Sequence, residues 1–278
     1  MVNRTNGFIL ALTVVLSLHV PCARSQSVSP FRLKIVPQAI PSSNSKAKVE
    51  SDQQAAAVLH KAQNALGGRR NIQAIHDVTC EVEMVNLDTK EHARSTSEII
   101  FPNVVRLTTD GPLGELVAFS DGDSGWASSA MGLDDRLPDW QIKASRQDLF
   151  RQLETLMQSD GNPDRKVEFV ERGKVEDRPA DILKISSATA GSVRVWIDAG
   201  SGDLLELEYQ RIVGRGSGPL VTDFFSDYQW VNKTIRIPFR IHTLSDGQPY
   251  MDTEVVRVEY NKGLKGDVLS KKPAPKQH

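Results

Sequence analysis

The chain has 278 residues, which is enough for one large β domain, or two small ones, with a sizeable core. Its formal net charge is −1, only 6% of its residues are aromatic, and no basic stripe runs along the sequence. These features argue against a nucleic-acid-binding surface.

Residues 1–25 have the pattern of a secretory signal peptide. Arg4 supplies a positive charge, the segment from Phe8 to Val20 is apolar, and Ala23-Arg24-Ser25 is a small-x-small cleavage site. The apolar segment is too short to serve comfortably as a membrane span. We therefore expect export to the periplasm, or secretion, after cleavage near Ser25.

The two cysteines of the chain are Cys22 and Cys80. The His-Val-Pro sequence before Cys22 is a poor lipobox, so soluble export is favoured over a lipid-anchored form. Cleavage near Ser25 removes Cys22 and leaves the mature chain without an internal disulfide. Cys80 alternates with Val78 and Val82, a pattern that predicts a small buried hydrophobic residue rather than a reactive thiol.

Residues 26–50 are rich in Ser, Pro and Lys and show no period, so we expect a flexible, extended linker there. The sequence Ser51-Asp52-Gln53-Gln54 has the form of a capping box, and Gly67-Gly68 is a stop signal, which together predict a helix. Its apolar face carries Ala55, Leu59, Ala62 and Leu66. Such a narrow stripe of small residues lets a helix pack closely against a sheet.

The stretch from Ile99 to Trp126 organises the predicted sheet. It contains two strands, with an edge or bulge at Pro102, because proline cannot donate to a strand ladder. The sequence Gly111-Pro112-Leu113-Gly114 predicts the reversal between the strands. The second strand, Glu115 to Ser120, ends at the turn dipeptide Asp121-Gly122, and Trp126 opens the next strand.

The sequence Gly122-Asp123-Ser124-Gly125 resembles the residues around the nucleophile of chymotrypsin-like serine proteases. That chemistry requires a base beside the serine and an orienting carboxylate. In those proteases the serine is usually followed by Gly-Pro, whereas here Trp126 follows Gly125. The segment Ala74-Ile75-His76-Asp77 resembles the Ala-Ala-His-Cys sequence of that family only in its histidine. We predict a hairpin turn and no catalytic residue, with a secreted hydrolase using Ser124 as the less favoured alternative.

A calcium-binding loop is the second alternative for Asp121 and Asp123. An EF-hand loop has another oxygen ligand two residues further on and a glutamate at its twelfth position. Gly125 and Gly132 occupy those positions here. We therefore predict no metal site, and nothing in the sequence predicts a cofactor.

From Val78 onward, apolar and polar residues alternate with a period of two, as is typical of strands. The first strands are followed by a loop at 131–138 and by a second helix capped by Ser145. The apolar face of this helix carries Leu149, Leu153, Leu156 and Met157. The predicted strands are 78–84, 97–101, 104–108, 115–120, 167–171, 180–186, 193–198, 204–211, 220–230, 235–244 and 253–260.

Short connections make neighbouring strands antiparallel, because a parallel crossover needs a dozen or more residues. Roughly ten or eleven such strands exceed what an open sheet holds without curling. We therefore predict a mainly β (α+β) fold, a curved antiparallel sheet that forms an unclosed β-barrel over residues 51–270, with two short helices as a lid or plug. Residues 271–278 are expected to form a disordered tail.

Three segments resemble the periplasmic outer-membrane lipoprotein carrier family. The first segment covers residues 101–126 and is similar to the family's pattern of Pro-Asn-x-x-Arg followed by Ser-Asp-Gly and then Trp. Its matching parts are Phe-Pro-Asn-Val-Val-Arg at 101–106 and Glu-Leu-Val-Ala-Phe-Ser-Asp-Gly-x-x-x-Trp at 115–126. The others are the strand-turn-strand at 195–208 and the segment 227–239. The resemblance implies a half-barrel with a helical lid, and an acyl chain, lipid or lipoprotein as the partner held in its cavity.

Side chains of one parity on the central strands, together with loop and lid residues, are the candidates for the lining of that cavity. The candidates are Leu116, Ala118, Trp126, Met131, Leu133, Leu149 and Leu153, with Arg106 as a candidate for an anionic head group. Ordinary core packing is the alternative for the apolar positions, and a solvated strand charge is the alternative for Arg106. A basic residue often precedes Pro-Asn in the carriers, where this chain has Phe101, so the resemblance supports a lipid-binding shape better than delivery of lipoproteins.

The sequence therefore favours a non-catalytic carrier or binder of acyl groups in the cell envelope. A bound chain would hardly leave into water unaided, so its release would require a receiving protein or membrane. A sensory or interaction module that uses the same fold to contact another envelope protein, without transferring lipid, is the alternative.

Overall fold

The computed structural model of the chain describes residues 44–129, 131–214 and 216–273. The expected signal peptide at 1–25, the linker up to residue 43 and the tail from residue 274 lie outside the described residues. In the described ranges, none of the helices has both the length and the apolar character that crossing a membrane requires.

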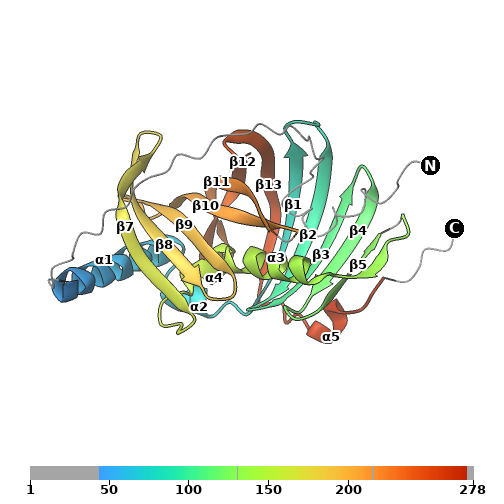
Figure 1. Ribbon diagram of the computed structural model, residues 1–278, viewed down its shortest axis with the longest axis horizontal. Coiled ribbons are helices and arrows are strands. Elements are labelled where there is room, and N and C mark those ends of the chain that lie inside the picture. Colours follow the sequence, from blue (N-terminus) through green and yellow to red (C-terminus); the bar gives the residue numbers. More distant parts are fainter. Residues whose placement is uncertain (1–43, 130, 215, 274–278) are drawn as a thin grey trace, which may run out of the picture.

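A single antiparallel sheet dominates the described part of the chain, and its strands curve around a concave side (Figure 1). Thirteen strands form it, in the order β6-β5-β4-β3-β2-β1-β13-β12-β11-β10-β9-β8-β7. They are β1 Asp77–Asn86, β2 His92–Ile100, β3 Val104–Gly111, β4 Gly114–Ser120, β5 Gly125–Ser129, β6 Asp134–Arg136, β7 Arg165–Val175, β8 Arg178–Ser187, β9 Gly191–Asp198, β10 Leu204–Val213, β11 Gly216–Val231, β12 Ile235–Ser245 and β13 Gln248–Tyr260. The predicted curved and unclosed sheet is confirmed.

The number of strands is higher than the ten or eleven that we predicted. Strand β6 lies inside the predicted loop at 131–138 and consists of three exposed charged residues, so it has no apolar alternation to reveal it. Pro102 also differs from the prediction, because it occupies the turn between β2 and β3 rather than an edge or bulge within a strand. The predicted reversal at Gly111 to Gly114 is present, since these two glycines pair across the β3–β4 hairpin.

Five helices accompany the sheet within the described residues: α1 Asn44–Ala65, α2 Arg69–Gln73, α3 Asp139–Phe150, α4 Leu153–Met157 and α5 Gly266–Leu269. Helix α1 begins at Asn44, so residues 44–50, which we expected in the extended linker, are helical. The second predicted helix is in fact two helices, α3 and α4. Ser145 is a buried residue inside α3 and not its cap, because the helix begins directly after Pro138, whose extended backbone precedes the first turn.

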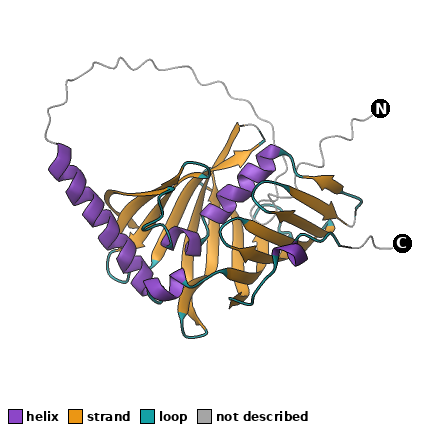
Figure 2. Ribbon diagram, turned by 90° about the horizontal axis from the view of Figure 1, so that it is seen from below, coloured by secondary structure: helices purple, strands orange, loops and turns teal. Residues whose placement is uncertain are grey.

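The connectivity of the sheet places α3 and α4 across its open side. The strands β1 to β6 and β7 to β13 form two successive meanders, and the pairing of β1 with β13 joins the meanders at the centre of the sheet. Consequently β6 and β7, which follow each other in the sequence, form its two opposite edges. The connection between them contains α3 and α4, and both views show α3 lying across the strands (Figures 1 and 2). We call α3 and α4 the lid helices.

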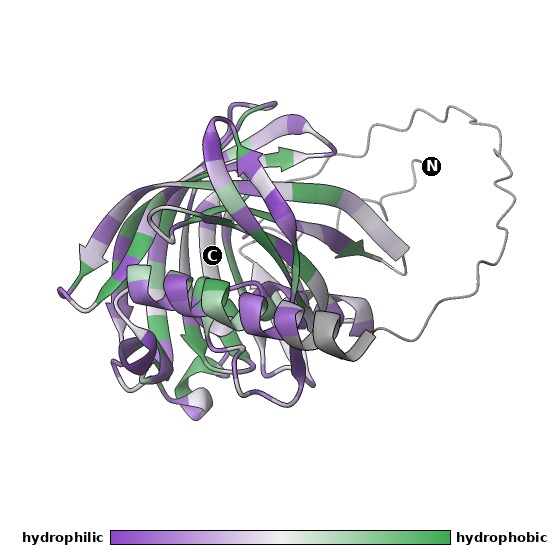
Figure 3. Cartoon of the chain, turned by 90° about the vertical axis from the view of Figure 1, so that its left-hand side faces the viewer, coloured by the Kyte–Doolittle hydropathy of each residue, from purple (hydrophilic) through white to green (hydrophobic). Residues whose placement is uncertain are grey.

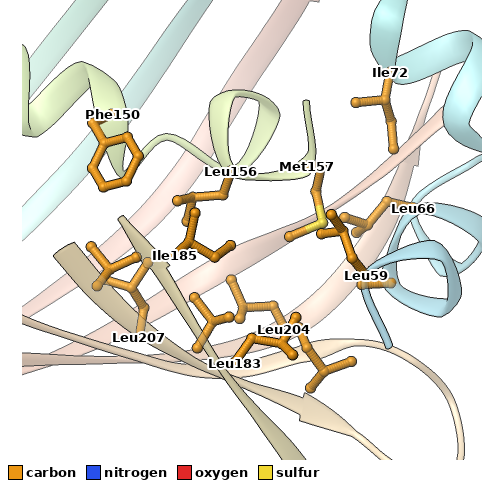
Figure 4. Close-up of a cluster of buried hydrophobic side chains, with 14 of the residues drawn as sticks. Leu59, Leu66, Ile72, Phe150, Leu156, Met157, Leu183, Ile185, Leu204 and Leu207 are labelled. Atoms are coloured by element: carbon orange, nitrogen blue, oxygen red, sulfur yellow. The ribbon is translucent and has the colours of Figure 1, made fainter. Parts of the chain in front are cut away.

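The largest hydrophobic cluster lies where α1 and the lid helices meet strands β7 to β12. Leu59 and Ala62 of α1, and Leu66 directly after its end, are almost completely buried, which confirms the predicted apolar face. Apolar and polar positions succeed each other along this helix (Figure 3). The helix packs against Leu183 and Met157, among others (Figure 4). Each such leucine contributes about 2 to 5 kcal/mol relative to alanine, so α1 is an integral part of the domain.

Candidate functional site

A cavity of about 190 Å³ lies between the lid helices and the concave face of the sheet. Its walls come from β1, β2 and β10 to β13, and on β1 and β2 they are alternate residues, as the period of two along a strand requires. On β1 these residues are Val78, Cys80 and Val82. Most of the other wall residues are apolar, for example Ile99, Leu207, Phe225, Ile241 and Val255. The cavity therefore offers a mainly hydrocarbon surface enclosed by the lid.

A second, smaller cavity of about 60 Å³ lies beneath α3 and adjoins the first. Both cavities are bounded by Ser97, Ile99 and Gln152, so they are neighbours along the same concave surface. The hydroxyl of Ser145, on α3, borders the smaller cavity and has no hydrogen-bond partner within the described residues. Together the two cavities form an elongated space under the lid helices.

Arg151, at the end of α3, introduces a buried charge at the wall of the larger cavity. Its Nη2 lies 3.0 Å from Oδ1 of Asp148, and its Nη1 lies 3.6 Å from Oδ2 of Asp223 on β11. The hydroxyl of Thr243, opposite Asp223 in the neighbouring strand, donates to Oδ1 of Asp223 at 2.7 Å. The guanidinium also lies 4.4 Å from the ring centroid of Tyr209, within cation–π distance.

The pKa values in this cluster follow from burial and from the neighbouring charges. Burial by itself lowers the pKa of Arg151, but Tyr209, Asp148 and Asp223 outweigh it and raise the pKa, so this guanidinium stays charged. Burial raises the pKa of Asp223, and Arg151 and the Thr243 hydroxyl oppose that rise only in part. The cluster fixes the lid to the sheet, and no motif in the sequence pointed to it.

A second polar group in the larger cavity is the carboxyl of Glu154, in the first turn of α4. The hydroxyl of Tyr260 on β13 donates to its Oε1 at 2.7 Å. Burial raises the pKa of Glu154, although the bond from Tyr260 opposes the change. Burial, with the nearby Glu154 and Glu81, raises the pKa of Cys80 to about 12. Cys80 is therefore a neutral thiol at the cavity wall, not a reactive thiolate.

Three of the predicted cavity residues do line the cavities. Ala118 and Leu149 border the smaller cavity, and Leu153 borders the larger one. Leu116 has the same parity as Ala118 on β4 and therefore points to the same side of the sheet, at a partly buried position.

Neither of the two predicted loop residues lines a cavity. Leu133 packs against the cluster of Ala118, Ala127, Leu137 and Ile142, next to the smaller cavity. Met131 is 66% exposed.

Trp126 and Arg106 lie on the opposite, outer face of the sheet. Arg106 alternates on β3 with Val105 and Leu107, which line the smaller cavity, so it points to the other side of the sheet, and the Trp126 ring lies beneath its guanidinium, 5.5 Å from ring centroid to Cζ. The indole Nε1 of Trp126 donates to the carbonyl of Ser270 at 2.9 Å, and Nη1 of Arg106 donates to the carbonyls of Leu269 and Lys271 at 2.8 and 2.7 Å. In this structure, these two residues hold α5 and the following segment on the outer face, and neither lines a cavity.

The loop that suggested a hydrolase forms a compact turn. Oδ1 of Asp121 accepts hydrogen bonds from the amides of Asp123 and Ser124, and Oδ2 accepts one from the Ser124 hydroxyl at 3.0 Å. Burial raises the pKa of Asp121, but these hydrogen bonds outweigh burial and hold the pKa below its ordinary value. The serine hydroxyl therefore stabilises a turn, as the turn dipeptide Asp121-Gly122 predicted.

Solved structures with a similar fold are lipoprotein-sorting proteins and related domains. A candidate outer membrane lipoprotein-sorting protein domain from Vibrio parahaemolyticus is 13% identical, covers 78% of this chain and all of its own, and gives a TM-score of 0.50. A LolA superfamily protein from Nitrosomonas europaea is 12% identical over 78% of this chain and 97% of its own, with a TM-score of 0.52. A DUF1329 family protein from Desulfovibrio piger is 10% identical over 77% and 96%, with a TM-score of 0.51. No family model and no curated protein matches the sequence.

These likenesses define the class of the fold. It is the open half-barrel of these structures, and the fold that the sequence resemblance implied is confirmed. One of the similar proteins is named for lipoprotein sorting and another for the LolA superfamily.

Proposed function

We propose that this protein is an exported, non-catalytic carrier or binder of acyl chains or lipoproteins in the cell envelope. The observation that supports this most directly is the mainly apolar cavity between the lid helices and the concave face of the sheet. The similar solved structures, one of them a lipoprotein-sorting domain, support the same role. The secretory pattern of residues 1–25 supports a location outside the cytoplasm.

The energetics favour a hydrocarbon ligand. Each buried methylene contributes about 0.8 kcal/mol, so one long, fully sheltered acyl chain would contribute on the order of 10 kcal/mol. The larger cavity, at about 190 Å³, is only somewhat larger than an apolar cavity of ~150 Å³ that takes up benzene. It therefore accommodates part of a chain, and a complete chain requires the lid helices to move outward. Ala118, Leu149 and Leu153 are the predicted residues that we assign to the chain's path.

Lipid extraction tests this function directly. Protein purified from the envelope fraction of its own cells should release fatty material into organic solvent, detectable by mass spectrometry. The refolded, delipidated protein should then bind a fluorescent palmitoyl probe.

The variant Leu153→Trp should weaken probe binding, because it fills the cavity, whereas Leu113→Trp should not, because Leu113 is 64% exposed in the β3–β4 turn. Protein that carries no lipid, binds no probe and instead purifies with another envelope protein would contradict the carrier role and favour the interaction module.

A further inference from the structure

The carboxyl of Glu154 is an unusual feature of a cavity that is otherwise mainly apolar. It projects from α4 into the larger cavity, and the hydroxyl of Tyr260 is its only side-chain hydrogen-bond partner among the residues that the structure describes. No basic side chain forms an ion pair with it in the same part of the chain. A buried carboxyl without a compensating cation is costly unless it is neutral or meets a polar partner.

The charges around the two cavities are unfavourable for an anionic ligand. Arg151 is the one basic residue among those that line the cavities in the described structure, and the acidic ones are Glu154, Asp223 and Asp148. The guanidinium of Arg151 is already paired with Asp148 and Asp223. A carboxylate head group that entered here would therefore lose its hydration beside Asp148 and Asp223, whose cation is already engaged.

The hydrogen-bonding state of Glu154 suits an uncharged carbonyl. Burial raises the pKa of Glu154, which favours its neutral form. In that form Oε1 accepts from Tyr260, as observed, and the protonated Oε2 is a hydrogen-bond donor. A donor inside an apolar cavity is complementary to the carbonyl oxygen of an ester or amide, which only accepts.

We infer that Glu154, oriented by Tyr260, is a specificity-determining residue that binds the carbonyl group of an uncharged acyl ester or amide, and that the nearby Asp148 and Asp223 make the same site unfavourable for free fatty acid anions. This inference rests on the proposed function, since it concerns the ligand of the same cavity. The apolar walls then hold the chain, and the carboxyl fixes the position of its polar end.

Three probes of equal chain length test the inference on the delipidated protein: methyl palmitate, palmitate and hexadecane. The unmodified protein should bind methyl palmitate more tightly than palmitate. The variant Glu154→Leu should weaken methyl palmitate binding about fivefold, the equivalent of one hydrogen bond, and leave hexadecane binding unchanged. The variant Glu154→Gln, which keeps an amide donor, should retain most of the affinity for the ester.

Glu206→Gln is the matched control. Glu206 is also a partly buried glutamate, but it lies on the outer face of β10, because its neighbour Leu207 points into the cavity. The Glu206→Gln variant should therefore leave the binding of all three probes unchanged. Hexadecane binding also shows that each variant has kept its folded cavity.

Two results would overturn the inference while leaving the proposed function intact. One is tighter binding of palmitate than of methyl palmitate by the unmodified protein. The other is an equal loss of hexadecane and ester binding in Glu154→Leu, with no ester preference in Glu154→Gln, since this would show that position 154 only packs. If none of the three probes binds the unmodified protein, the proposed function itself fails.

Discussion

The buried cluster around Arg151 allows a quantitative prediction about how the lid is held on the sheet. The variant Arg151→Met keeps most of the side-chain volume and removes the charge. The Arg151 side chain is only 6% exposed, and its partner Asp223 only 5%, so neither group can be hydrated when the other is lost. The Asp148 side chain is 30% exposed and can return to water.

Breaking a buried ion pair by removing one partner costs about 3 to 5 kcal/mol, because the remaining charge is left uncompensated. We expect Arg151→Met to lie near the lower end of this range, at about 3 kcal/mol, because Asp223 can bind a proton and because the nearby Arg211 still acts on its charge. For a domain of this size that corresponds to a decrease in Tm of roughly 6 to 12 °C. Urea unfolding followed by circular dichroism at pH 7 measures the change, provided that the transition is two-state.

A second substitution isolates the electrostatic part of the effect. In Arg151→Met, Asp223→Asn removes the carboxylate that has lost its partner, so the double variant should be less destabilised than the sum of the single variants, by on the order of 1 to 3 kcal/mol. The difference in free energy of unfolding between Arg151→Met and the unmodified protein should also become smaller between pH 7 and pH 5. In that variant the folded pKa of Asp223 lies even further above the unfolded one, so the folded form binds more protons and gains stability as the pH falls.

Arg172→Met is the control, because Arg172 forms a surface ion pair with Asp181 at 3.4 Å and its side chain is 80% exposed. It should change the free energy of unfolding by less than about 1 kcal/mol. Additive single and double variants, or a deficit of Arg151→Met that is independent of pH, would refute the view that Asp223 is the charge left unpaired.

Three further predictions concern other parts of the molecule. Burial, with the nearby Glu208, raises the pKa of Glu206 to about 7, so the folded state holds this proton more tightly than the unfolded state. The free energy of unfolding should therefore fall as the pH rises from about 4.5 to 7. The variant Glu206→Gln should reduce this pH dependence, as measured by urea unfolding at several pH values. Gly67, with a φ of 112°, has no room for a side chain, because a Cβ would come within 2.0 Å of the carbonyl oxygen of Thr234. The variant Gly67→Ala should therefore lower the Tm in thermal unfolding, and an unchanged Tm would contradict this packing. The variant Trp126→Phe removes the hydrogen bond to the carbonyl of Ser270, so it should lower the free energy of unfolding by about 1 kcal/mol and leave the affinity for the acyl probe unchanged. Weaker probe binding would show that position 126 contacts the ligand.

The local sequence determined the parts of this fold that depend on near neighbours in the chain. The period of two from Val78 onward and the short turns, such as the one at Gly111 to Gly114, predicted an antiparallel meander too long to stay flat. The positions of Leu59 and Leu66 predicted the buried face of α1. Within the candidate site, the period of two along β4 placed Ala118 on the concave side, since the face of a strand follows from spacing alone. Leu149 and Leu153 also line the cavities, but they lie on two helices, α3 and α4, where the spacing predicted one.

Only the tertiary structure decided the rest, because it depends on partners distant in the sequence. The register of β4 with β5 placed Trp126 opposite Phe119 and on the outer face, although we had predicted it on the same side of the sheet as Leu116 and Ala118. The pairing of β1 with β13 made β6 and β7 opposite edges and sent α3 and α4 across the opening. That crossing brought Arg151 to Asp223 and Glu154 to Tyr260, two contacts that span more than 70 residues of sequence and that no local pattern encodes.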